Sequence, residues 1–78
     1  MSKKQIEECV RTSLEGYFRD LRGTDPDGMY AMMVRVVEKP LLEVVMNHAE
    51  QNQSRAAEWL GLNRNTLRKK LLEHKLIK

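Results

Sequence analysis

The stretch that decides the fold is Gln53–Leu71, which reads Q-S-R-A-A-E-W-L-G-L-N-R-N-T-L-R-K-K-L. It predicts two short helices joined by a turn that contains a glycine, and this arrangement is a helix-turn-helix, whose second helix enters the major groove of DNA. Ala57 is small where the two helices cross, and Gly61 follows four residues later at the turn. Leu67 comes six residues after Gly61 as the first inward residue of the second helix. The spacing therefore favours a DNA-binding unit.

Residues with strong positional preferences mark the ends of these helices. Asn52 and Asn63 are good N-caps for the first and second helix. Gly61 suits the left-handed C′ position that ends the first helix. The second helix is densely cationic, with Arg64, Arg68, Lys69 and Lys70 within seven residues.

The cationic helix supplies the candidate DNA contacts. Arg64, at the helix N-terminus, has the fork geometry for a bidentate guanine contact, worth about 1–3 kcal/mol of discrimination. Asn63 could read adenine or simply cap the helix. Phosphates are the expected partners of Arg68, Lys69 and Lys70. No catalytic nucleophile, metal-ligand cluster or cofactor-binding loop is present, so we expect no enzyme, no metal and no cofactor.

The first helix of the motif adds a second set of phosphate contacts. Ser54 and Arg55 lie at its start, where free backbone N–H groups favour anions. Across a dimer the two helices would make about eight to ten phosphate contacts, so log K should fall against log salt with a slope of about −7 to −9.

Length, charge and cysteine content limit the class of protein. At 78 residues the chain is one domain with a thin core, a size that usually requires very regular helix packing or a second subunit. Residues 1–50 carry seven Lys/Arg and nine Asp/Glu, whereas residues 51–78 carry seven and two, which favours polyanion binding through the last third. A single cysteine, Cys9, and the lack of an apolar leader predict a cytoplasmic protein without a membrane span.

Residues 1–50 read as dimerisation helices and residues 51–78 as the DNA-binding unit, within one all-α domain. The first helix is expected over residues 2–22, with a capping box formed by Ser2 and Gln5. Its apolar stripe consists of Ile6, Val10, Leu14, Tyr17, Phe18 and Leu21. A loop follows over residues 23–28, in which Asp25 could N-cap the next helix with Pro26 at its first position.

Residues 29–49 are apolar on nearly all sides and predict a helix interrupted or kinked at Pro40. A helix of this composition must be buried all round, which 78 residues cannot do alone. We therefore expect an obligate homodimer. His48–Gln51 reads as a polar hinge, and Leu76 or Ile77 as a tail that folds back onto the motif. His48 and His74 are expected to be solvated or at helix ends.

Two sets of segments point to one known family. The motif half contributes Asn52–Ala57 and Gly61–Leu71, and the front half contributes Gly23-Thr24-Asp25, Met29-Tyr30, Pro40–Glu43 and Val45-Met46. Through these segments the whole chain resembles the Fis family of bacterial nucleoid proteins. The resemblance implies an intertwined homodimer with four helices per subunit. It also implies binding to degenerate, AT-rich sites in the bacterial nucleoid, DNA bending and transcription regulation. By that similarity Asn63 and Arg64 reach bases, and phosphates are held by Asn52, Ser54, Thr66, Arg68, Lys69 and Lys70.

The chain departs from that family's pattern in three ways. It begins almost at the first helix, so it resembles a short form without the N-terminal arm of members that act in site-specific inversion. Glu50 and Glu73 stand where basic residues are usual, which implies weaker contact with flanking DNA. Asn65 replaces a usual glycine in the recognition helix and joins the candidate DNA surface.

The sequence leaves two alternative functions open. One is a dedicated sequence-specific transcription factor, or a DNA-binding module of the enhancer-binding activators, which share the C-terminal third of the chain. The other is a helical dimerisation adaptor whose cationic helix meets an acidic protein partner. No membrane and no small-molecule substrate are expected in any of these cases.

Overall fold

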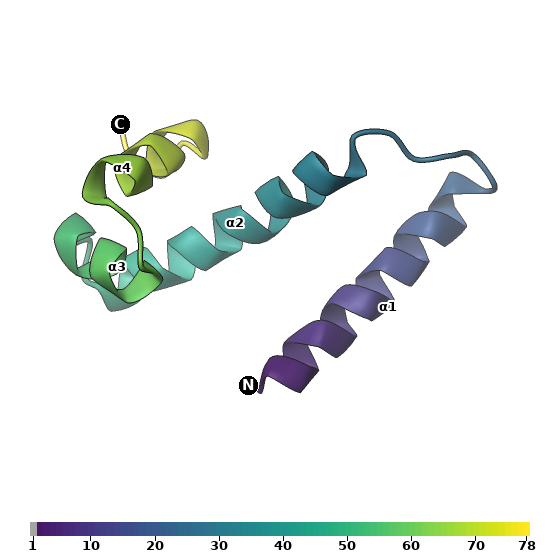
Figure 1. Cartoon of the computed structure of the whole chain (residues 1–78), viewed down its shortest axis with the longest axis horizontal. Coiled ribbons are helices and arrows are strands. Elements are labelled where there is room, and N and C mark those ends of the chain that lie inside the picture. The colour runs from purple at the N-terminus through teal and green to yellow at the C-terminus, as the bar shows by residue number, and fades with distance from the viewer. Residues whose placement is uncertain (1) are drawn as a thin grey trace.

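The computed structural model describes residues 2–78, so Met1, the first residue of the expected dimerisation segment, lies outside the described residues. Over residues 2–78 the chain folds into four α-helices, α1 (Lys3–Leu21), α2 (Met29–His48), α3 (Gln53–Leu60) and α4 (Arg64–Glu73). Figure 1 shows α3 and α4 gathered at the C-terminal end of α2, while α1 runs back from the opposite end. The all-α prediction is confirmed. Across residues 2–78 no helix is both long and apolar enough to cross a membrane.

The start of α1 follows the predicted capping box. The Ser2 hydroxyl oxygen accepts a hydrogen bond from the Gln5 N–H at 3.2 Å, and the Gln5 side-chain oxygen accepts one from the Ser2 N–H at 2.7 Å. These two bonds satisfy donors that the first turn of a helix would otherwise leave free.

The helix α2 starts at Met29, as the predicted range of residues 29–49 indicated, but its cap is not the one expected. Asp25 and Pro26 do not begin the helix. The N-cap is Gly28, which has φ 61°, and no side chain caps it. The backbone turns into α2 through a left-handed residue, which glycine adopts at little cost, so the turn falls three residues later than the Asp-Pro pair indicated.

Pro40 lies inside α2 without interrupting it, so of the two predicted alternatives, an interrupted or a kinked helix, the interruption is wrong. Proline lacks the N–H that would bond to the carbonyl four residues earlier, here that of Val36. Val36 is exposed, so solvent can hydrate the backbone near it. One helix of 20 residues therefore joins the N-terminal half of the chain to the motif.

The buried core belongs to the last half of the chain. Its buried residues are Leu42, Met46, Ala49, Ala56, Ala57, Leu67 and Leu71. The tail packs against this core through Leu76 and Ile77, as predicted. The C-terminal end of α2 thus packs against α3 and α4 as part of the helix-turn-helix core. This core extends across residue 50, where the boundary between the dimerisation helices and the DNA-binding unit was expected.

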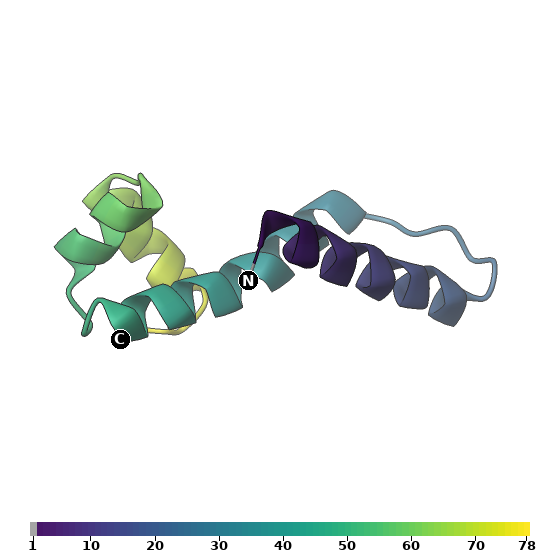
Figure 2. The same ribbon diagram turned by 90° about the horizontal axis from the view of Figure 1, so that it is seen from below.

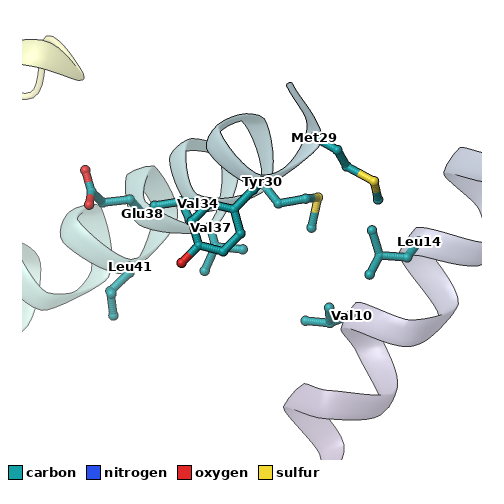
Figure 3. Close-up of a pocket in the computed structure, with 9 residues that line it drawn as sticks. Val10, Leu14, Met29, Tyr30, Val34, Val37, Glu38 and Leu41 are labelled. Carbon is teal, nitrogen blue, oxygen red and sulfur yellow. The ribbon is translucent and has the colours of Figure 1, made fainter. Parts of the chain in front are cut away.

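The N-terminal half has no comparable core. No residue of α1 is buried, and Ile6 and Phe18 on its apolar stripe are about half exposed. An open apolar groove of about 740 Å³ separates α1 from α2. Figure 3 shows Val10 and Leu14 of α1 directed toward α2, with Met29 beside Leu14 and with Val37 and Leu41 on the far side of the groove.

Candidate nucleic-acid interface

The recognition helix α4 is held by its apolar face. Leu67 and Leu71 are completely buried, one turn apart on that face. They meet the small residues Ala56 and Ala57 of α3 within a single apolar cluster. Because small side chains let helix backbones approach closely, α3 and α4 cross tightly, and the opposite face of α4 is left toward solvent.

The turn between α3 and α4 has the predicted geometry. Gly61 adopts φ 71°, its N–H bonds to the Glu58 carbonyl at 3.2 Å, and the Leu62 N–H bonds to the Ala57 carbonyl at 2.9 Å. This pair of bonds is a Schellman motif, which ends a helix sharply. It redirects the chain within three residues, and so α4 starts beside the helix it packs on.

Asn63 is the N-cap of α4. Its side-chain oxygen accepts a hydrogen bond from the Asn65 N–H at 2.8 Å. A bidentate contact with adenine would need that same oxygen together with the amide nitrogen. The structure therefore shows the capping role, and Arg64 becomes the first helical residue, with its side chain exposed.

The candidate DNA contacts of α4 form one exposed surface, with a single exception. The exposed members are Asn63, Arg64, Asn65, Thr66, Arg68 and Lys69. Lys70, also predicted to hold a phosphate, is half-buried, and its side chain is directed toward α2 instead of toward solvent. Its Nζ lies 2.9 Å from Oε2 of Glu38 on α2.

The start of α3 contributes the second part of the interface. The Asn52 side-chain oxygen accepts a hydrogen bond from the Arg55 N–H at 3.1 Å, so Asn52 caps α3 as predicted. Ser54 and Arg55 follow in the first turn, and both are exposed. A phosphate near this turn would meet one cation, one hydroxyl and the positive end of the helix dipole.

Sequence reasoning missed a polar cluster behind α4, formed by Glu38, Lys70 and His74 and termed here the Glu38 cluster. The other oxygen of Glu38, Oε1, lies 2.9 Å from Nε2 of His74. An ionised carboxylate can only accept, so Nε2 carries the proton and donates. The His74 side chain is 3 % exposed, and that of Glu38 18 %. His74 does stand at the end of α4, as predicted, but it is buried instead of solvated.

The Glu38 cluster shifts the protonation of its members. The pKa of the Glu38 carboxyl is lowered, chiefly by the hydrogen bond from Lys70 and then by the one from His74. The pKa of the Lys70 ammonium is raised by the same hydrogen bond and by the negative charge of Glu38. Near neutral pH, Glu38 and Lys70 are therefore a charged pair.

The charged cluster lies at a junction that no local pattern reveals. Glu38 precedes Lys70 by 32 residues and His74 by 36. The one available signal is that Lys70 and His74 are four residues apart on α4, and so share a face.

The fold and this surface together define a helix-turn-helix protein with a cationic recognition helix. Residues 33–74 match the family described as bacterial regulatory protein, Fis family. The chain is 54 % identical over 77 residues to a putative Fis-like DNA-binding protein of Ralstonia nicotianae, covering 99 % of this chain and 100 % of that protein.

Two further relatives extend the similarity. A putative Fis-like DNA-binding protein of Neisseria meningitidis serogroup A is 57 % identical over 72 residues, covering 92 % of this chain and 91 % of that protein. The DNA-binding protein Fis of Proteus mirabilis is 40 % identical over 74 residues, covering 95 % and 76 %. The chain therefore belongs to the Fis family of bacterial regulatory proteins.

Proposed function

We propose that this chain is a homodimeric DNA-binding protein that places α4 of each subunit in a major groove. The observation that carries the proposal is the exposed surface of α4, where Arg64, Arg68 and Lys69 face solvent. A helix that begins with an exposed arginine and continues with cations meets the needs of base reading and phosphate contact together. The printed names of the relatives support DNA as the partner.

The surface that one chain leaves uncovered supports the pairing of two chains. The radius of gyration is 15.0 Å, whereas a compact domain of this length has about 11.5 Å. The chain exposes 6535 Å², against about 4,900 Å² for a folded monomer of its mass. Two chains that each buried the excess would bury about 3,300 Å², which lies within the range of obligate homodimers.

The groove between α1 and α2 is the surface where we place the second chain. Exposed apolar side chains flank or line it, and they come from both helices. They include Ile6, Phe18, Tyr30, Val34, Val37 and Leu41. A patch of this size on a free monomer would aggregate, and a copy of α2 laid into it would bury both faces.

The proposed biological role is that of a nucleoid-associated regulator that recognises degenerate, AT-rich sites, bends the DNA and regulates transcription. The family resemblance along α1 and α2 supports it, because a detached DNA-binding module would need to share only the motif. By this proposal the protein binds DNA without performing chemistry on it, and it acts in the bacterial nucleoid.

Mobility-shift titration of the full chain on a panel of duplexes tests this role. Binding to many AT-rich fragments with altered mobility of bent complexes supports a nucleoid regulator. One strong palindrome and weak binding elsewhere would instead identify a dedicated transcription factor. Failure to bind any duplex at moderate salt would refute DNA binding and favour an acidic protein partner.

A further inference from the structure

We propose that Glu38 is a positioning residue of the helix-turn-helix, and that Lys70 is its internal counter-charge instead of a phosphate contact. Glu38 belongs to α2, the helix we assign to dimerisation, whereas Lys70 and His74 belong to α4 or its C-terminal end. The cluster therefore ties the recognition helix directly to the helix that would set the distance between the two subunits. The inference rests on the proposed function, since it specifies how that function's recognition helix is held.

The geometry of the cluster favours a fixed arrangement. Each carboxylate oxygen of Glu38 has its own donor at 2.9 Å, Nζ of Lys70 on one side and Nε2 of His74 on the other. With both oxygens occupied, the carboxylate cannot rotate without breaking a bond. Because His74 is almost completely buried, any displacement of α4 along α2 would leave a buried donor without a partner, which is costly.

The apolar core alone defines the position of α4 along α2 less well. Leu67 and Leu71 meet small alanine side chains on α3, and apolar contacts are not directional. The Glu38 cluster adds a directional contact on the α2 side of α4, at its C-terminal end. Hydrogen bonds from charged groups fix orientation more sharply than packing does.

Lys70 differs from its neighbour Lys69 in a way that the sequence hides. The two residues are adjacent and identical in type, yet Lys69 is exposed, whereas the Lys70 side chain is only 32 % exposed and paired. A phosphate contact by Lys70 would have to break the bond to Glu38 and leave that carboxylate with His74 alone. Without Lys70, the two subunits together hold two fewer phosphates than expected, so the expected salt slope becomes about −5 to −7.

Figure 3 shows where Glu38 stands relative to the proposed dimer groove. Its backbone lies beside Val34, Val37 and Leu41, and its carboxylate points away from the groove residues of α1. Glu38 thus connects the two functions of α2, since the same short segment meets the groove on one side and α4 on the other.

The test compares the salt dependence of DNA binding for Lys69→Gln and Lys70→Gln in the full chain. A lysine that holds a phosphate contributes about 0.9 to the slope in each subunit, so its replacement in a dimer flattens the slope by about 1.8. We expect Lys69→Gln to flatten the slope by about 1.8 and Lys70→Gln to change it by less than about 0.5. Equal flattening by both variants would overturn the inference, while a parent slope near zero would overturn the proposed function instead.

Glu38→Gln supplies the positioning readout. It keeps the shape of the side chain but frees Lys70, so we expect a steeper salt slope and a smaller ratio of affinities between a preferred site and an unrelated duplex. A variant that is merely less stable would melt earlier and keep the ratio. An unchanged slope and ratio would therefore contradict the positioning role.

Thermal unfolding tests the cluster without DNA. In a double-mutant cycle, Glu38→Gln combined with Lys70→Gln should lower Tm by less than the sum of the two single changes, because each single change already breaks their bond. Strict additivity would show that the two side chains do not interact and would overturn the inference even if no duplex bound.

Discussion

The two halves of this chain bury their apolar side chains in different ways. The C-terminal region (residues 42–77) closes a core of its own, in which Leu42, Leu67 and Leu71 are completely buried. The N-terminal region (residues 3–41) consists of longer helices, and Figures 1 and 2 show α1 lying apart from α3 and α4. Its apolar side chains line an open groove. The length of its helices therefore does not decide whether a region can bury its own apolar side chains. The C-terminal region closes because the small residues Ala56 and Ala57 let its helices pack closely, whereas α1 and α2 leave their apolar faces open to the groove.

The largest expected effect is a loss of stability in the C-terminal region. Leu67→Ala removes a completely buried side chain between α3 and α4 and should cost about 2–5 kcal/mol of unfolding free energy. Chemical denaturation measures it. Leu72→Ala is the matched control, because Leu72 is an exposed leucine on the same helix. Similar losses of stability for both variants would contradict the core described here.

The next largest effect is expected on the proposed dimer, through the groove of the N-terminal region. Val37→Glu places a charge in the groove between α1 and α2 and should raise the dimer dissociation constant by about 100-fold or more, since every 1.4 kcal/mol is tenfold. Sedimentation velocity over a concentration series measures it. Lys39→Glu, at an exposed position of the same helix outside this groove, should leave the dimer intact.

A third change tests the proposed DNA-contacting surface of α4 and leaves the folding of both regions unchanged. Arg64→Ala should lose about 1–3 kcal/mol of discrimination at the base it reads, while salt-dependent nonspecific binding persists. Competition between a preferred and a scrambled duplex measures the loss. If the variant kept the parent's full preference, Arg64 would not be the base-reading residue.

The junction between the halves should respond to acid. The pKa of Glu38 in the folded chain lies below its ordinary value of 4.5. The bonds of Glu38 therefore stabilise the fold fully above pH 4.5, and this contribution disappears as pH falls through the lowered value. Melting temperatures measured from neutral pH downward should fall less steeply in Glu38→Gln than in the parent. Glu58→Gln, at an exposed position on α3, should follow the parent, and an identical acid response of all three proteins would contradict the assignment.

In alkali, the contribution of the Glu38 cluster to the stability of the fold should instead decrease as pH rises. The pKa of Lys70 in the folded chain is raised above 10.5, so its contribution is complete below pH 10.5 and disappears as pH rises through the raised value.

The smallest expected effect concerns the hinge between α2 and α3. Glu50 follows the end of α2 with φ 55°, a conformation that costs side chains other than glycine about 1 kcal/mol or more. Glu50→Gly should therefore raise the unfolding free energy by about 1 kcal/mol. Glu50→Ala removes the charge but keeps the side-chain strain, so it separates the two causes. A gain of equal size in Glu50→Ala would assign the effect to charge alone.

The sequence predicted the helices and caps well because their signals are local. Asn52, Gly61 and Asn63 each act within four residues of their own position, and the spacing of Ala57 and Leu67 follows from helix periodicity. The same reasoning failed at Asp25 and Pro26, where the composition fitted a helix start but the backbone turned later, at Gly28.

The rest of the site could not be predicted, since its signals are not local. Glu38, Lys70 and His74 meet only because α4 folds back over α2, and neither charge pattern nor periodicity relates positions so far apart. In the sequence alone, Lys70 is one more cation of the recognition helix. Its partial burial and its partner became visible only with the tertiary arrangement.

Sedimentation equilibrium of the free chain tests the central claim most directly, because the proposed function needs two recognition helices held by one core. At micromolar concentration and moderate salt we expect a single species with twice the chain mass of 9.1 kDa. A stable, well-folded species at 9.1 kDa that remained monomeric as concentration rose would contradict the claim.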